Sequence, residues 1–430
     1  MSGALNRFGA VAVLSLAFAG VQGQAGPFGR LPSWSPEQAR EDLDVLVKKL
    51  KSHHPALYRY CTPEQFDRCA DSLRRSITAP CTEFEILNRL AAFYPLLGDG
   101  HTLFLPSEEW AQQAPARYFP LPITVTDSAL FIRCGAGLVD SSLAGAHVLS
   151  INGVPSASIL DTLVMRQVRD GMHTDYAIWV LDQWFKSYYR FSFGEPEQYH
   201  VLVEKAGQRQ ELTFRARSAD ELPGPCVAPS DSRLKLTLLG NDVAVMRIPS
   251  FAKGDLRPSE IDAAFDTLRM HGVERLVLDL RGDQGGEPRS AKRLLAHLLD
   301  RRFRLVRMGP HHGWVSPVAN RYTGALCTLL DGGSFSVTAM VLAQLETHQR
   351  GPLIGSESGG CRTVISGSGR TVVLPNTRIA CTISRKDWWL VDAAVDGRGV
   401  QPTHPIAPDV TMPWRRDAAF VKALELLGVH

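Results

Sequence analysis

The chain has 430 residues, of which 44% are hydrophobic, and this predicts two or three domains with sizeable cores. The formal net charge of +3 is small, so the composition gives no reason to expect a nucleic-acid partner. Eight cysteines show no C-x-x-C metal-ligand spacing and permit about 105 complete disulfide pairings, so no pairing is assigned.

The N-terminus has the pattern of an export signal. Arg7 precedes an apolar run over residues 9–20, and small residues follow that run. The run is too short to span a bilayer but suits the core of a signal peptide. Residues 1–23 are therefore predicted to be a removed signal, and the mature protein is expected to be periplasmic or secreted, without stable membrane insertion. Disulfides can form in such an oxidising compartment.

A small helical N-terminal domain is predicted over residues 30–105. Ser35, Thr62 and Thr82 each stand where a helix cap is expected, before a first turn that contains glutamate. The domain ends in a tight turn at 99–102, which carries the sequence Asp-Gly-His-Thr.

Residues 118–216 are predicted to form a mixed, mostly β module. Asn152-Gly153 is a strong hairpin signal between strand-like segments. The expected elements are strands at 130–133, 148–151 and 199–203 and a helix at 157–169. Residues 217–234 contain prolines and glycine and are expected to be a linker.

Strands alternate with helices from residue 235 to the C-terminus. Strands are expected at 243–248, 276–280 and 325–330, each followed by a segment with helical periodicity. This alternation predicts an α/β domain over 235–430 with a largely parallel sheet.

Two strand ends in this domain are candidates for a site, because open α/β sheets bind ligands outside the carboxyl ends of their strands. At the first, the strand that ends near Leu280 runs into a glycine-rich loop. Gly285 or Gly286 there would let a backbone N–H approach an oxyanion. The alternative is a structural turn in which Asp279 and Arg281 pair with each other.

Ser336 stands at the second strand end. The apolar run 325–330 and a Gly-Gly turn precede it, and a helical pattern follows. Backbone N–H groups at a helix N-terminus favour developing negative charge, so a nucleophilic serine would gain most there. The alternative is that Ser336 is an ordinary helix cap.

A serine nucleophile needs a base, and the chain offers 13 histidines. His101 is the leading candidate because it lies in the glycine-containing turn 99–102. His147 and His200 fall within strands and are interpreted as structural. The pairs His53-His54 and His311-His312 could each be a weak metal site, although no carboxylate lies nearby at ligand spacing.

Several motifs, in this order, resemble those of the tail-specific (C-terminal processing) and tricorn-core serine peptidases. The helical region with His54-Pro55-Ala56-Leu57-Tyr58 and the turn 99–102 resemble the bacterial branch. The matching segments farther along the chain are the glycine loop 278–286, the nucleophile turn 331–339, the "GexT"-like segment 353–360 and the C-terminal motif 397–402.

The resemblance implies a crotonase-like ββα catalytic core, preceded by the helical domain and a PDZ-like α+β module. It also implies that an activated serine hydrolyses peptide bonds, with Ser336 as the nucleophile. Tail-specific members pair this serine with a lysine, but Cys361 occupies the lysine's position, and Lys292 and Lys386 lie outside the motif. The serine-lysine dyad is therefore expected to be absent.

Tricorn-like members instead use a histidine from the early turn, which matches His101. Their carboxylate partner matches Asp396, with Asp392 and Asp409 as alternatives. The expected oxyanion donors are the N–H groups of Gly285 or Gly286 and of Val337. Three residues depart from the family pattern: Asp283 replaces an asparagine, Ala339 a glutamate and Thr403 an aspartate.

The sequence thus predicts an exported serine peptidase that acts on a peptide or protein substrate and requires neither a metal nor an organic cofactor. Two alternatives stay open: a non-catalytic ligand- or peptide-binding protein on the same scaffold, and a serine esterase. The sequence leaves open the cleavage preference, the oligomeric state and whether the middle module gates the site.

Overall fold

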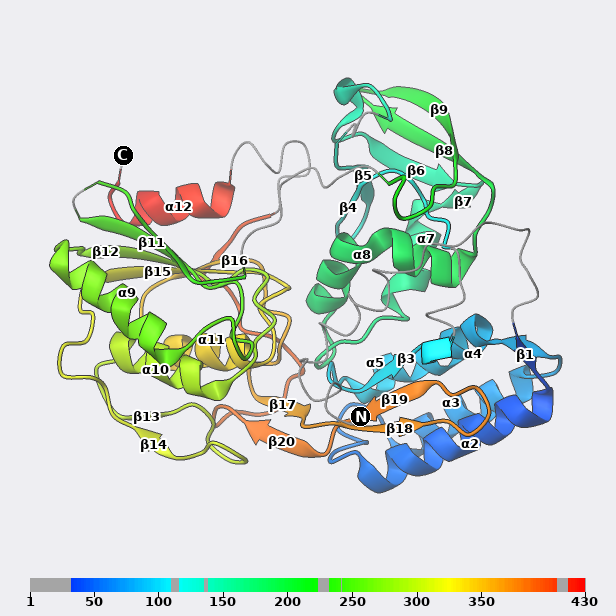
Figure 1. Cartoon of the computed structure of the whole chain (residues 1–430), viewed down its shortest axis with the longest axis horizontal. Coiled ribbons are helices and arrows are strands. Elements are labelled where there is room, and N and C mark those ends of the chain that lie inside the picture. Colours follow the sequence, from blue (N-terminus) through cyan, green and yellow to red (C-terminus); the bar gives the residue numbers. More distant parts are fainter. Residues whose placement is uncertain are drawn as a thin grey trace.

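The computed structural model describes residues 32–109, 116–134, 138–222, 232–240, 242–407 and 417–429. The predicted signal peptide at 1–23 and the alternative carboxylate Asp409 lie outside these ranges. Helices and strands are mixed along the described chain, which confirms the predicted α/β class (Figure 1). None of the helices within these ranges combines the length and apolarity that a membrane span requires.

The C-terminal half is built on a six-stranded sheet of order β10-β11-β12-β15-β16-β21. The strands are β10 (Lys235–Leu238), β11 (Val243–Arg247), β12 (Arg275–Asp279), β15 (Ala325–Leu330), β16 (Leu353–Gly355) and β21 (His404–Pro405). Neighbouring strands from β11 to β21 are parallel, and only β10 pairs antiparallel with β11. The sheet is therefore largely parallel, as the alternation of strands and helices predicts.

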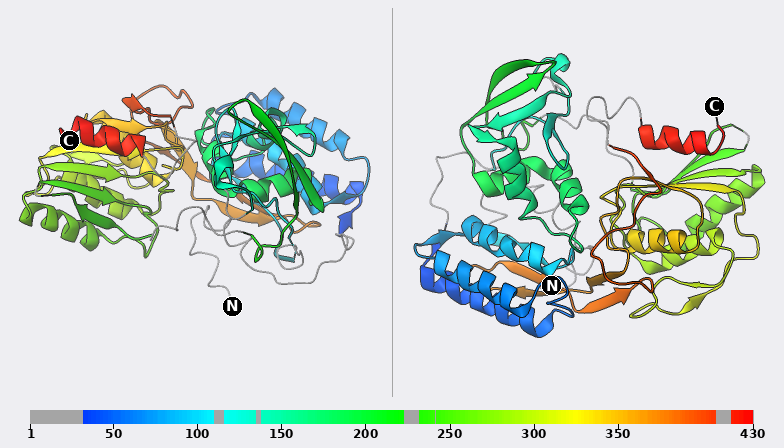
Figure 2. Two further views of the ribbon diagram at one scale, coloured as in Figure 1. Left: turned by 90° about the horizontal axis from the view of Figure 1, so that it is seen from above. Right: turned by 180° about the vertical axis from the view of Figure 1, so that it is seen from behind.

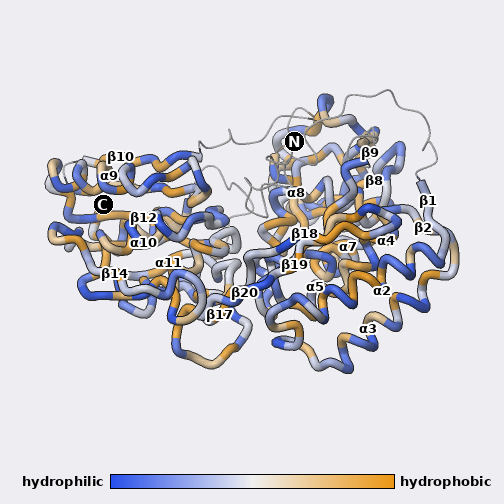
Figure 3. The backbone as a smooth tube through the Cα atoms, turned by 60° about the horizontal axis from the view of Figure 1, so that its bottom comes forward, coloured by the Kyte–Doolittle hydropathy of each residue, from blue (hydrophilic) through white to orange (hydrophobic). Residues whose placement is uncertain are grey.

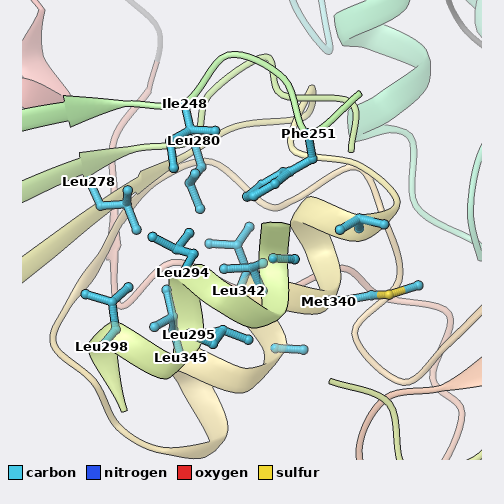
Figure 4. Packing of buried hydrophobic residues seen from close by; sticks show 14 of the residues in the cluster. Ile248, Phe251, Leu278, Leu280, Leu294, Leu295, Leu298, Met340, Leu342 and Leu345 are labelled. Atoms are coloured by element: carbon cyan, nitrogen blue, oxygen red, sulfur yellow. The ribbon is translucent and has the colours of Figure 1, made fainter. Parts of the chain in front are cut away.

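Helices cover both faces of this sheet (Figures 1 and 2). They are α9 (Pro258–Met270), α10 (Pro288–Leu298), α11 (Val337–Thr347) and α12 (Ala418–Leu426). Successive strand residues alternate between the two cores: Leu276 and Leu278 pack with α9, α10 and α11, whereas Val277 packs with α12. Figure 4 shows leucines of α10 and α11 gathered beneath Leu278 and Leu280 at the end of β12. This packing fixes the loops that follow β12 and β15.

The middle segment has its own sheet, of order β4-β5-β6-β8-β9. Its strands are β4 (Ile123–Val125), β5 (Leu130–Ile132), β6 (His147–Ile151), β7 (Val154–Pro155), β8 (Gln198–Lys205) and β9 (Gln208–Arg215), with helices α7 (Ser156–Val164) and α8 (Asp175–Phe193). The predicted hairpin turn at Asn152-Gly153 is present, since β7 pairs with β6. The helix α8, which is kinked at Trp184, was not predicted.

The N-terminal segment is helical, as predicted. Its elements are β1 (Ser33–Trp34), α2 (Pro36–His53), α3 (Pro63–Ser76), β2 (Cys81–Thr82), α4 (Glu83–Leu90), η1 (Ala91–Phe93), α5 (Tyr94–Leu97) and β3 (Leu103–Leu105). Ser35, Thr62 and Thr82 each form the capping box that the sequence indicates. Figure 3 shows hydrophilic and hydrophobic residues alternating along α2 and α3, which is typical of helices with one buried face.

A hairpin from the C-terminal half completes the N-terminal segment. It consists of β18 (Arg370–Val373) and β19 (Ala380–Ile383), and β19 pairs antiparallel with β3. Three short pairs of strands remain: β1 with β2, β13 (Phe303–Arg304) with β14 (Trp314–Val315), and β17 (Val364–Gly367) with β20 (Lys386–Trp389). The hairpin crosses the expected domain division at residue 235, and it connects the His101 turn to the α/β half (Figure 1).

Candidate active site

Ser336 lies between the end of β15 and the start of α11, at the strand-turn-helix junction that the sequence indicates. Its φ of 55° and ψ of −120° place a residue with a Cβ in a region that favours glycine, at a cost of about 1–3 kcal/mol. Ser336 occupies the N-cap position, yet its side chain makes no capping hydrogen bond. The interpretation as an ordinary helix cap is therefore wrong, because the hydroxyl is directed elsewhere.

The Ser336 hydroxyl meets the imidazole of His101. The distance between His101 Nε2 and Ser336 Oγ is 3.1 Å, although 235 positions separate the residues in sequence. The imidazole stacks on Phe335 at a centroid distance of 4.9 Å, and Tyr176 stacks on the other side of Phe335 at 4.1 Å. Gly100 leaves room for this stack, since a Cβ there would lie 2.5 Å from the Phe335 ring.

Burial lowers the pKa of His101 below its usual value, although the nearby Asp99 carboxylate acts in the opposite direction. The imidazole is therefore neutral at neutral pH, as a general base must be.

Asp99 is a buried, ionised carboxylate that shapes the His101 turn. It accepts hydrogen bonds from the backbone N–H of His101 at 2.9 Å, from Thr102 Oγ1 at 2.6 Å and from His54 Nε2 at 3.0 Å. Because the backbone N–H of Ala56 donates to His54 Nδ1, the His54 proton sits on Nε2. Although burial acts in the opposite direction, the hydrogen bond from His54 is the main cause that holds the pKa of Asp99 well below its usual range. His54 therefore stabilises the His101 turn indirectly, by donating a hydrogen bond to Asp99.

The glycine loop after β12 lies against the nucleophile turn. A Cβ on Gly285 would stand 2.6 Å from the Val337 nitrogen, so only glycine fits there. The Gly285 N–H donates to Asp283 Oδ1 at 2.8 Å, which removes it from the set of expected oxyanion donors. The N–H groups of Gly286 and Val337 have no acceptor among the described residues, and both stay available.

Asp331 ties the two loops together. Its Oδ1 accepts the N–H of Gly282 at 2.8 Å and that of Gly333 at 2.9 Å. Ser334 Oγ adds a hydrogen bond to the Leu280 carbonyl at 3.0 Å. The glycine loop and the nucleophile turn therefore form one rigid unit.

Asp283, which stands where the family pattern has asparagine, is fully buried. Burial is the main cause that raises the pKa of Asp283 to about 8. A protonated carboxyl has nearly the shape of an amide, so this residue can replace asparagine at neutral pH. Asp279 and Arg281 do pair with each other at 2.8 Å, as the structural alternative for that part of the loop proposes.

The other expected carboxylates lie away from the imidazole. Asp396 is exposed, and its Oδ1 accepts the backbone N–H of Arg398 at 3.0 Å within a local turn. Asp392 is also exposed and pairs with Arg307 at 2.8 Å. His101 Nδ1 is buried without a hydrogen-bond partner among the described residues, so the structure does not bring Asp396 to the imidazole.

Cys361 stands at the lysine position of the serine-lysine peptidases. It is buried beside the Tyr60 hydroxyl at 3.8 Å, and burial raises the pKa of its thiol well above the usual value. A neutral buried thiol is neither a base nor a nucleophile at neutral pH. Cys361 therefore does not take over the role of that lysine.

Two groups of side chains within the described ranges have the composition and closeness of a metal site. One is Asp99, His101 and Asp170, and the other is His173, Asp175 and Glu357. One carboxylate of each group is engaged with protein: Asp99 accepts three hydrogen bonds, and Glu357 pairs with Arg398. That the reaction requires no metal stays a prediction.

Sequence reasoning missed the aromatic residues and carboxylates that support the dyad. Tyr176 and Trp179 come from α8, and Trp179 packs against the glycines of the nucleophile turn. His54 reaches Asp99 across 45 positions, and Asp170 reaches the Gly100 N–H across 70. Such separations carry no local signal. Of the residues in this aromatic stack, only Phe335 could be placed near the site from the sequence, because it directly precedes Ser336.

Comparison with known proteins assigns a class to this arrangement. Residues 242–406 match the family model described as peptidase family S41. They form a domain of that family, which confirms the resemblance seen in the sequence. The carboxy-terminal processing protease CtpB of Bacillus subtilis (strain 168) is 23% identical over 168 residues, or 38% of this chain. The match spans 34% of that relative's length.

Solved structures share the fold over nearly the whole chain. Mature CPAF aligns with a TM-score of 0.63 and 15% identity, covering 91% of this chain and 96% of that one. Mature CPAF complexed with lactacystin aligns at 0.65 and 15% identity, covering 91% and 97%. At this level of identity the likeness establishes the fold alone. The family match concerns the part of the chain that carries the α/β sheet.

Proposed function

We propose that this chain is an exported serine peptidase in which Ser336 is the nucleophile and His101 the general base. The observation that carries the proposal is the 3.1 Å contact between His101 Nε2 and Ser336 Oγ. The strained backbone of Ser336 and its lack of a capping bond support a reactive role, because such strain concentrates at functional sites.

The chemistry follows from this pair. Ser336 Oγ bonds to the scissile carbonyl carbon while its proton passes to His101 Nε2. The same proton then protonates the leaving amine as the C–N bond breaks. Water hydrolyses the resulting acyl ester with His101 again as base. The N–H groups of Val337 and Gly286 would receive the oxyanion, and losing one such donor typically costs about 10²–10³ in rate.

The proposal extends to the modules and to the compartment. The α/β half would be a crotonase-like core, and residues 118–216 a PDZ-like module able to bind a peptide as an added strand. The disulfide at Cys134 supports an oxidising compartment and so favours export. If deletion of residues 118–216 leaves peptide affinity unchanged, the assignment of the module fails.

Labelling with a fluorophosphonate tests the nucleophile. The wild-type chain should react, and Ser336→Ala should abolish the reaction while the chain stays folded. Ser316→Ala is the matched control, since Ser316 is exposed and should leave labelling intact. A folded wild-type chain that never reacts would favour a non-catalytic binder.

Two further measurements separate the remaining alternatives. His101→Ala should lower labelling by about 10³ or more, as removal of a triad member does, whereas His200→Ala, at an exposed site, should not change it. Turnover on peptide and ester libraries then separates a peptidase from an esterase. Near-normal turnover of His101→Ala would remove that residue from the mechanism.

A further inference from the structure

Two buried polar atoms beside the catalytic pair lack partners. His101 Nδ1, on the side of the ring away from Ser336, has no hydrogen-bond partner among the described residues, and neither has Asp170 Oδ2. A ring nitrogen of His101 and a carboxylate oxygen of Asp170 lie within 4.8 Å of each other. Unpaired buried donors and acceptors are costly, so two on neighbouring side chains call for a joint explanation.

Asp170 is held rigidly at this position. It is 2% exposed and lies between α7 and α8. Its Oδ1 accepts the N–H of Gly100 at 2.8 Å, directly before His101 in the chain. The neighbouring Gly171 N–H donates to the Gly98 carbonyl at 2.9 Å. These bonds fix the carboxyl group of Asp170 relative to the His101 turn.

Asp99 is the other carboxylate within reach, and it is already engaged. Its two oxygens accept three hydrogen bonds, from His54, Thr102 and the backbone of His101. Of the two, Asp170 is therefore the carboxylate with an oxygen available to accept from His101 Nδ1.

We propose that Asp170 is the positioning carboxylate of this site, accepting the Nδ1–H of His101 at Oδ2 in the role expected of Asp396. This inference rests on the proposed function. Ser336 can give its proton only to a bare Nε2, so the ring proton must sit on Nδ1. A carboxylate beside Nδ1 selects that tautomer and stabilises the imidazolium that forms.

Burial acts on the pKa values of both groups. Burial and the Asp99 charge raise the pKa of Asp170 to about 8, while burial lowers the pKa of His101. The backbone N–H groups of Gly100 and Cys361 and the Arg59 charge oppose the increase at Asp170, and the Cys361, Tyr60 and Tyr176 side chains, all with raised pKa values, also face it. Burial thus disfavours a charge on either group, and a hydrogen bond from the His101 Nδ1–H to Asp170 Oδ2 would satisfy both.

The ¹⁵N shifts of the His101 ring, measured in folded Ser336→Ala protein, test this without requiring activity. We expect a protonated Nδ1 and a bare Nε2, and we expect Asp170→Asn to change both the tautomer and the pH at which the ring titrates. Asp396→Asn, which removes the rival carboxylate, should leave both unchanged. If His101 Nδ1 carries no proton in the folded Ser336→Ala protein, the proposal is refuted, even if Asp170→Asn does not fold.

Labelling provides the second arm. Asp170→Asn should slow fluorophosphonate labelling by about 10⁴, the effect of amide substitution in a triad, and shift its pH profile, whereas Asp396→Asn should stay near wild type. If Asp396→Asn slows labelling and Asp170→Asn does not, the positioning role belongs to Asp396. If the wild-type chain never labels, the peptidase proposal fails, and the ring shifts still decide whether Asp170 positions His101.

Discussion

Replacing Asp283 by asparagine tests the charge state of the residue beneath the glycine loop. Burial raises the pKa of Asp283 to about 8 in the folded chain, from an ordinary value of 3.8. Between these values the folded chain keeps a proton that the unfolded chain releases, so the free energy of unfolding falls as pH rises. The stabilising contribution is complete below the unfolded pKa and is lost as pH passes the folded pKa.

The size of the effect follows from one proton. A difference of one bound proton changes the free energy of unfolding by about 1.4 kcal/mol per pH unit. Between about pH 5.5 and 7.5, the wild-type chain should therefore lose roughly 3 kcal/mol more than Asp283→Asn. Asp170, whose pKa is also raised to about 8, contributes equally to both proteins and cancels in the difference.

Urea denaturation followed by tryptophan fluorescence at several pH values measures this difference. The amide oxygen that Asp283→Asn introduces should still accept the Gly285 N–H, so labelling of Ser336 should survive the change. Asp392→Asn is the control, because its side chain is 79% exposed, and its curve should run parallel to wild type. If the difference in free energy of unfolding between Asp283→Asn and wild type does not change with pH, the carboxyl of Asp283 is ionised in the folded chain, and the reasoning is refuted.

Four other outcomes are expected. Ser336→Gly should raise the free energy of unfolding by about 1–3 kcal/mol through relief of the positive φ, with labelling lost. Gly285→Ala should lower turnover by about 10²–10³, because the added Cβ would lie 2.6 Å from the Val337 nitrogen and would displace that expected oxyanion donor. Gly313→Ala is the control, since a Cβ there meets nothing within 4 Å. His54→Ala should cost about 1–3 kcal/mol in a melting experiment by removing one of the three hydrogen bonds to the buried Asp99 carboxylate. Labelling should rise with pH through a midpoint below 6.5, because burial lowers the His101 pKa and the neutral ring is the base.

Local patterns were sufficient for much of the fold. The capping boxes at Ser35, Thr62 and Thr82 depend on residues three positions apart, so the sequence displays them directly. The same holds for Ser336, whose strand, turn and helix are contiguous. The long helix α8 was missed because aromatic residues such as Trp184 and Tyr188 have weak helix propensity, and tertiary packing decides their conformation.

The site shows where sequence reasoning stops. The glycines of the loop could be recognised, but the donation of the Gly285 N–H to Asp283 depends on side-chain geometry that no motif contains. Asp396 matched a family position, yet its carboxylate is engaged with its own turn. Asp170 comes from a segment without a recognisable motif, and only the folded chain places it beside the His101 turn.

The β18–β19 hairpin has a consequence for when the chain could first become active. Strand β19 holds β3, and the Ser384 N–H donates to Thr102 Oγ1 at 3.1 Å, so the imidazole depends on residues synthesised after the nucleophile. An incomplete polypeptide would have its hydroxyl but no anchored base. The pairing of His101 with Ser336 would then form only at the close of folding, once the hairpin has docked against β3.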